Sequence, residues 1–145
     1  IWVIVEGGTP ESIGRVIYNN LPPGIAMKGS QSVWVPKLNG DIVQVLYDLP
    51  KAAPLYVRAT IKNFSDSTID TTYIAQQLAQ TIYNIGERAE TATITGNIKE
   101  ALGDSGNPYN VEISLDGNTW AEDLVPAGLD EFFSIQMDNV NLQVV

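Results

Sequence analysis

The sequence predicts an α+β protein of two small lobes, in which helices pack on mostly antiparallel sheets. Segments that alternate apolar and polar residues are typical of strands with one buried face, and Leu55–Lys62 is the clearest of them. The segment Thr71–Arg88 instead spaces its apolar residues as a helix does. Asn39-Gly40 is the strongest hairpin signal, because both residues tolerate the positive φ of a type I′ turn.

The first lobe is expected to span residues 1–63 and to run strand, helix and three strands. Its helix should begin at Thr9-Pro10-Glu11, since Thr9 can cap the helix and proline suits the first helical position. The buried helical face is predicted to hold Ile13, Val16, Ile17 and Leu21. The expected strands are Ile1–Glu6 as a central strand, Ser32–Pro36, Asp41–Asp48 and Leu55–Lys62, with a break at Pro50–Pro54.

The second lobe is expected to span residues 64–145 and to run helix, helix and three strands. Ser67 or Asp70 should cap the long helix Thr71–Arg88, which buries a stripe of Ile74, Leu78, Ile82 and Ile85. A shorter helix should begin at Thr95-Gly96-Asn97 and end at Gly103. The remaining expectations are a strand Tyr109–Leu115 with Val111, Ile113 and Leu115 inward, a turn at Asp116-Gly117-Asn118, and a final antiparallel pair formed by Phe132–Met137 and Val140–Val145.

Charge and composition exclude several classes of partner. The 145 residues include 8 lysines and arginines against 17 acidic residues, a net charge of −9. Such a chain lacks the cationic face that nucleic acid or an anionic membrane surface requires, so neither partner is expected. Its apolar runs are far shorter than the roughly 20 residues of a membrane helix. Because the chain opens at Ile1, directly in an apolar run, we expect it to be a fragment of a longer protein.

The chain contains no histidine and no cysteine, which removes the common catalytic triads and the usual structural zinc sites. A hydrolase would have to use paired carboxylates across a cleft. The acids considered for that role are Asp116, Glu122, Asp123, Asp130 and Glu131, and the favoured interpretation is solvated acids near turns. We therefore predict no enzyme, no catalytic residues, and no cofactor-binding or metal-binding residues.

Three further features suggest a ligand only weakly. Asp104–Pro108 has calcium-loop residue types without the EF-hand spacing, and Gly7-Gly8 lacks the rest of a phosphate-binding motif, so both are interpreted as turns. Trp2 and Trp34 are expected to pack in the core or at an edge. For Trp120 the sequence allows either packing or exposure as a platform for a sugar or a protein partner.

The segment 17–62, IYNNLPPGIAMKGSQSVWVPKLNGDIVQVLYDLPKAAPLYVRATIK, resembles the C-terminal part of the baseplate J-like family of phage tails. The resemblance lies in the order of its features. These are a helix that ends at Pro23-Gly24-Ile25, then Gly29, the strand around Ser32–Val35, the Asn39-Gly40 hairpin, the strand Val43–Tyr47, the Pro50–Pro54 break and the alternating strand Leu55–Ile61.

This resemblance implies a virion structural protein without catalytic residues. The chain would be a wedge component of a contractile phage tail baseplate, or of a prophage or other tail-like particle, assembled in the bacterial cytoplasm. Its partners would be other baseplate and tail proteins, with homo- or hetero-oligomers only in the full assembly. The alternative is a glycan-binding module that uses Trp120, and a carboxylate-based hydrolase is the third hypothesis. The C-terminal segment Val140–Val145 is a candidate for strand addition to a neighbour's sheet.

Overall fold

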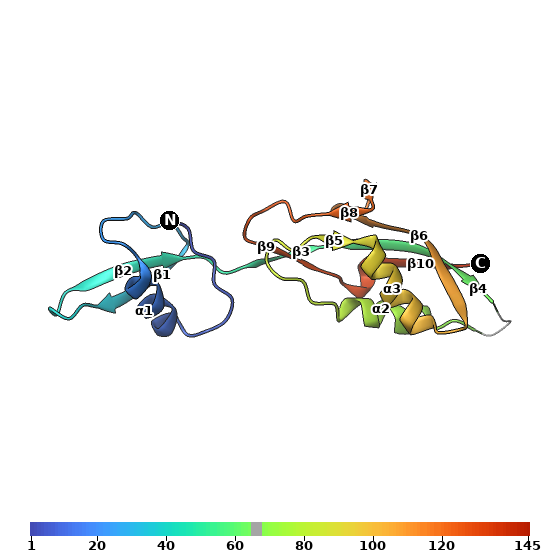
Figure 1. The fold of residues 1–145 in the computed structure, drawn as a ribbon, viewed down its shortest axis with the longest axis horizontal. Coiled ribbons are helices and arrows are strands. Elements are labelled where there is room, and N and C mark those ends of the chain that lie inside the picture. The colour runs from blue at the N-terminus through green and yellow to red at the C-terminus, as the bar shows by residue number, and fades with distance from the viewer. Residues whose placement is uncertain (65–67) are drawn as a thin grey trace. The chain divides into compact units, whose positions relative to one another are not determined.

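The computed structural model describes residues 1–64 and 68–145 and confirms an α+β fold (Figure 1). The chain forms two compact units, residues 1–51 and 52–145. The predicted boundary at residue 63 is therefore twelve residues late. The strand that begins at Tyr56 belongs to the sheet of the second unit, because its pairing partners all lie downstream.

The first unit is built from helix α1 (Pro10–Asn20) and a hairpin of strands β1 (Gln31–Pro36) and β2 (Ile42–Tyr47). The predicted helix start is confirmed. The Thr9 hydroxyl accepts a hydrogen bond from the Ser12 amide at 3.3 Å, and the Ser12 hydroxyl accepts one from the Thr9 amide at 3.2 Å. This reciprocal capping satisfies two amides at the helix start. The buried residues of this unit are Ile13, Ile17, Val35, Val45 and Tyr47.

The face that α1 buries differs from the predicted one at Val16, which is 61% exposed. Gly14 explains the difference. It lies so close to β1 that an added Cβ would stand 2.4 Å from a methyl carbon of Val33. Because the glycine permits this approach, the side of α1 that carries Ile13, Gly14 and Ile17 faces the hairpin, and Val16 faces solvent.

The hairpin is confirmed, but its turn is not type I′. Among the described turn residues only Gly40 has a positive φ, at 89°. The Gly40 amide bonds the Lys37 carbonyl at 3.1 Å, and the Lys37 amide bonds the Asp41 carbonyl at 2.7 Å. These bonds close a three-residue loop, in which a turn is followed by a glycine bulge. Asn39 contributes its side chain instead, by accepting a bond from the Asp41 amide at 3.1 Å.

The expected central strand Ile1–Glu6 does not form. The segment makes isolated parallel bridges only, Trp2 with Lys28 and Ile4 with Asp48. Ile1–Val5 are half-buried or exposed, because they run along the margin of the unit and no strand encloses them on both sides. The apolar run reflects this partial burial rather than a place inside a sheet.

The second unit has a four-stranded sheet in the order β10 (Val140–Val144), β4 (Tyr56–Asn63), β6 (Gly106–Ser114) and β7 (Trp120–Ala121). β4 runs antiparallel to β6 and parallel to β10. The predicted alternation of β4 is confirmed, since Leu55, Val57, Ala59 and Ile61 are buried. Helices α2 (Thr71–Ala79) and α3 (Thr91–Leu102) contribute Ile74, Leu78, Ile94, Ile98 and Leu102 to the same core.

The inward pattern predicted for β6 holds only in part. Ile113 is fully buried, but Leu115 is 40% exposed and Ser114 is buried in its place. The register between β4 and β6 shifts near Asn110, which has a positive φ of 50°. This bulge precedes the three predicted residues and leaves their own alternation unbroken. The pattern fails at Leu115 because β6 ends at Ser114, whose hydroxyl bonds the Asp116 carboxylate in the following turn.

The long helix predicted for Thr71–Arg88 ends nine residues early, at Ala79. Its start is confirmed, because the Asp70 carboxylate accepts the Tyr73 amide at 3.0 Å, whereas Ser67 lies outside the described residues. Beyond Gln80 the chain is irregular, so Ile82 is 87% exposed and Tyr83 enters the core beside Phe133. The next helix begins at Thr91 rather than Thr95 and ends at Gly103 as predicted.

The remaining strands form two small pairs. β3 (Lys51–Pro54) pairs with β9 (Glu131–Ser134), and β5 (Ala89–Glu90) pairs with β8 (Asp123–Leu124). The predicted break at Pro50–Pro54 is thus mostly strand. The expected final antiparallel pair is wrong, because the 3-10 helix η1 (Met137–Asn139) redirects the chain and β10 pairs with β4 instead. No helix of the described chain has the length and apolarity to span a membrane.

Candidate interaction surfaces

Most of the five acids considered for catalysis have structural roles. Asp123 forms an ion pair with Arg88 at 2.6 Å. A carboxylate oxygen of Glu131 accepts the Gly128 amide at 3.2 Å, Asp130 is buried, and Glu122 is exposed. None of these acids lines the grooves described below.

Asp116 organises the turn that follows β6. Its carboxylate accepts hydrogen bonds from the amides of Thr119 and Asn118, at 2.9 and 2.8 Å, and from the Ser114 hydroxyl at 2.9 Å. The bond from the Thr119 amide is the largest of several that hold the Asp116 pKa below its ordinary value. The carboxylate therefore stabilises the predicted turn, with Gly117 at a positive φ of 79°.

The two weak ligand-loop signals also lie in ordinary structure. Asp104 and Ser105 form a turn, and Gly106–Pro108 open β6. Gly7 and Gly8 lead into the capped start of α1. Among residues 1–64 and 68–145, no group of three or more acidic, histidine or cysteine side chains is placed to hold a metal ion.

The three tryptophans have different surroundings. The Arg58 guanidinium lies 4.1 Å from the centre of the Trp120 ring, and the same arginine pairs with Glu112 at 3.0 Å. One face of Trp120 is therefore covered, which leaves less of the ring for a sugar. Trp34, for which packing was expected, is 58% exposed on the outer face of the first unit's hairpin.

Trp2 belongs to a polar cluster around Asp48. The Asp48 carboxylate accepts hydrogen bonds from the Ser30 hydroxyl at 2.5 Å, the Ser30 amide at 2.8 Å and the Trp2 indole at 2.6 Å. These bonds, that of the Ser30 hydroxyl first, lower the Asp48 pKa to about 2. The cluster joins the N-terminal segment to the end of β2.

The Asp48 cluster makes the stability of the first unit sensitive to acid. Because the folded-state pKa lies below the ordinary value of 3.8, ionised Asp48 stabilises the fold above pH 4. That stability is lost as the pH falls from about 4 toward about 2. We expect Asp48→Asn to lower the melting temperature at pH 6 and to flatten the dependence of the melting temperature on acid pH. Tryptophan fluorescence measures the melting temperature at each pH. An Asp48→Asn protein with the wild-type acid dependence would contradict this assignment.

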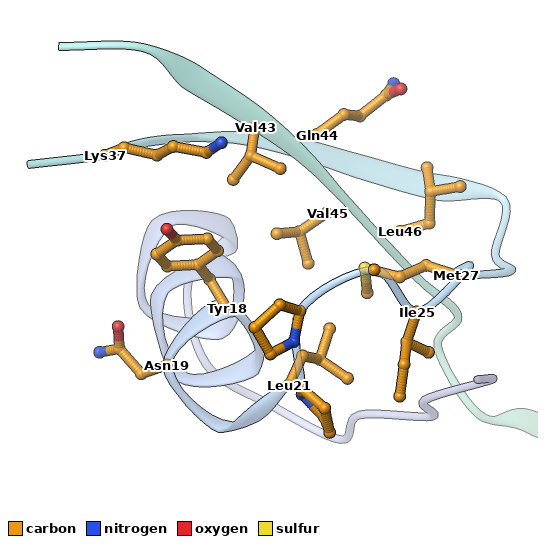
Figure 2. A pocket seen from close by; sticks show the side chains of 13 residues that line it. Tyr18, Asn19, Leu21, Ile25, Met27, Lys37, Val43, Gln44, Val45 and Leu46 are labelled. Carbon is orange, nitrogen blue, oxygen red and sulfur yellow. The ribbon is translucent and has the colours of Figure 1, made fainter. Parts of the chain in front are cut away.

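The first unit carries a groove of about 620 Å³ between the end of α1, the following loop and β2 (Figure 2). In Figure 2 Tyr18 and Lys37 lie on one side of the cavity, and Ile25, Met27 and Leu46 lie on the other. A second hollow of about 560 Å³ shares Tyr18 and Lys37 with the first and adds Arg15. The two together form one surface, here called the α1 groove, with an apolar part and a cationic end.

The second unit presents a free sheet edge at β10. Val145 directs both its amide and its carbonyl toward β4, bonding Ile61 and Asn63. Since backbone groups alternate along a strand, the amides of Leu142 and Val144 point away from the sheet. No other strand of the described chain pairs there. The sequence of β10, Val-Asn-Leu-Gln-Val, has no charge and no proline, the features that usually protect an edge.

A groove of about 450 Å³ adjoins this edge, between α2 and β10. Ala75, Met137, Val140 and Leu142 supply its apolar lining, and Asp138 is its only charged residue. A strand added beside β10 would place alternate side chains there. The segment predicted as a strand at Val140–Val145 thus forms an edge strand, although its predicted pairing with Phe132–Met137 is wrong.

Sequence reasoning did not find the α1 groove. Its walls come from residues 18–27 and 37–46, which are brought together only by the packing of α1 on the hairpin. The one local signal was the pair of cations Arg15 and Lys37 within otherwise apolar segments. A scan of the chain against models of known protein families gives no match, and a search of curated proteins gives none either.

Proposed function

We propose that this chain is a non-catalytic structural component of a contractile phage tail baseplate, or of a related tail-like particle, and that it assembles through contacts with other baseplate and tail proteins. The proposal rests on the resemblance of residues 17–62 to the baseplate J-like family. The observation that carries the assembly role is the unprotected edge of β10, with its adjoining groove. It acts in the virion, after assembly in the bacterial cytoplasm, and neither nucleic acid nor a membrane is its partner.

The edge supplies a physical mode of assembly. A strand from a neighbouring tail protein would bond the outward backbone groups of β10, and its alternate side chains would fill the groove beside Ala75 and Leu142. Backbone bonds provide affinity in such an addition, whereas the groove selects the side chains. The glycan-binding alternative gains no comparable support, since Arg58 covers Trp120.

Two proline variants of β10 test this role. Val144→Pro removes an outward amide and should leave the free energy of unfolding within about 1 kcal/mol, because that amide makes no bond in the chain. Gln143→Pro removes an amide directed at β4, so it should destabilise the isolated chain by about 1 kcal/mol or more. In immunogold electron microscopy of purified tail particles, the wild-type chain should be labelled at the baseplate. Particles assembled with Val144→Pro in its place should carry no label, although the variant is folded.

The proposal fails in either of two results. If the immunogold label on the wild-type chain is absent from tail particles, or lies elsewhere than at the baseplate, the proposed baseplate function is contradicted. Normal incorporation of Val144→Pro would remove the β10 edge from the assembly mechanism. Urea denaturation of each purified variant shows whether a loss of incorporation is a loss of folding.

A further inference from the structure

The charge of the chain is divided unevenly between its two units. Residues 1–51 contain four basic and four acidic residues, a net charge of zero. Residues 52–145 contain four basic and thirteen acidic residues, a net charge of −9. The whole surplus of negative charge therefore belongs to the second unit, whereas the α1 groove lies in the neutral one.

The α1 groove is lined by two cations and no acid. Neither Arg15 nor Lys37 has an ion-pair partner among residues 1–64 and 68–145. Away from these cations the lining is mainly apolar, apart from the amide side chains of Asn19, Asn39 and Gln44, and Ile25 is 40% exposed. The residues that make this apolar part are Tyr18, Leu21, Pro22, Met27, Val43 and Leu46. An acidic segment with apolar side chains would match both parts.

The second unit carries a loop that exposes apolar residues and follows one exposed acid. The loop at residues 125–130 runs from β8 to β9 as a long excursion (Figure 1). In this loop Leu129 is 80% exposed and Val125 is 51% exposed, and the exposed acid Glu122 precedes the loop. Here it is called the 125–130 loop.

We propose that the α1 groove binds the 125–130 loop of a second copy of this chain, with Glu122 at the end that carries Arg15 and Lys37. Charge complementarity selects this occupant, because the surplus acid lies in the unit that carries the loop. Each copy then presents one groove and one loop. The contact is head-to-tail, so it propagates from copy to copy into a ring or an open chain. It goes beyond the proposed function and uses a surface distinct from the β10 edge.

The wild-type chain should associate with increasing concentration in sedimentation velocity, from about 10 µM to about 1 mM. Raising the salt from about 0.05 M to about 0.5 M should weaken the association, since it screens the charges around Lys37. Lys37→Glu should weaken it roughly tenfold or more. Lys62→Glu is the matched control: it changes the net charge equally on an exposed strand residue outside the groove, and it should associate as the wild type does.

Mixing two inactive variants gives the decisive test of the head-to-tail geometry. Arg15→Glu/Lys37→Glu has a blocked groove and an intact loop, whereas Leu129→Asp has an intact groove and a loop that has lost its most exposed apolar residue. Each variant alone should be monomeric and folded by circular dichroism. Their equimolar mixture should form a dimer and nothing larger, because only one productive contact is possible.

Three results would overturn the inference. The wild type could remain monomeric throughout the concentration range, its association could be indifferent to Lys37→Glu, or the mixture could stay monomeric while the wild type associates. A self-association that Val144→Pro abolishes and the groove variants leave intact would likewise assign the contact to the β10 edge. The groove variants should still enter tail particles through β10 if the proposed function holds, so the two proposals can fail separately.

Discussion

Replacing Leu78 with aspartate should unfold the second unit, at a cost of about 4 kcal/mol or more in the free energy of unfolding. Leu78 is fully buried in the core between α2, α3 and the four-stranded sheet. A carboxylate there would lose its hydration without gaining a charged partner. Urea denaturation followed by circular dichroism measures the change.

Ile82→Asp is the matched control for this substitution. Ile82 lies four residues after Leu78 and was expected on the same buried stripe, but it is 87% exposed. The change should therefore alter the free energy of unfolding by no more than about 0.5 kcal/mol. Similar losses in Leu78→Asp and Ile82→Asp would mean that the helix continues past Ala79, as the periodicity alone predicts.

Gly29→Ala should destabilise the first unit by about 2 to 3 kcal/mol. A Cβ at this position would lie 2.4 Å from the backbone nitrogen and oxygen of Tyr47, and backbone atoms cannot turn aside as a side-chain end can. Tyr47 is itself buried in the core of the unit. Hydrogen exchange of peptides from residues 1–51 should show faster exchange in the variant.

The corresponding control is Gly96→Ala in α3. An added Cβ there meets no atom within 4 Å, and the residue has no positive φ. Alanine should stabilise the helix by about 0.5 to 1 kcal/mol, because glycine loses more backbone freedom on folding. Unchanged exchange in Gly29→Ala would show that residues 28–30 do not lie against Tyr47.

Predictions from local chemistry agree well with the structure. Capping by Thr9 and Asp70 depends on residues within one turn of the chain, and both caps form as expected. The alternation of β4 is equally local, because a strand with one buried face has a period of two. The end of α3 at Gly103, which has a φ of 58°, follows from the freedom of glycine in that conformation.

Predictions that needed long-range information failed. Ile82 continues the period of α2, yet the core is completed by Tyr83 and Phe133 from segments far apart in sequence. Likewise β10 follows β9 closely in the chain but pairs with β4, about eighty residues earlier, and in parallel. Adjacency in sequence predicts pairing only as a tendency, so neither arrangement could be predicted from local patterns.

The two candidate surfaces also differ in whether local sequence or long-range packing determines them. The segment Val140–Val145 was predicted to be a strand, and its residues alternate without any charge. The α1 groove depends on how α1 meets the hairpin, and the close approach at Gly14 that sets this packing has no signature in the sequence. Of the acids considered for a hydrolase, Asp116 holds a turn and Asp123 forms an ion pair, whereas Glu122 is exposed.

A near-atomic electron cryomicroscopy map of a tail particle that contains this chain would show directly whether β10 pairs with a neighbouring protein. We expect both units within the baseplate, with a strand of a neighbouring tail protein hydrogen-bonded along the outer edge of β10 and its side chains in the groove beside Ala75. A baseplate without this fold, or with the β10 edge facing solvent, would contradict it.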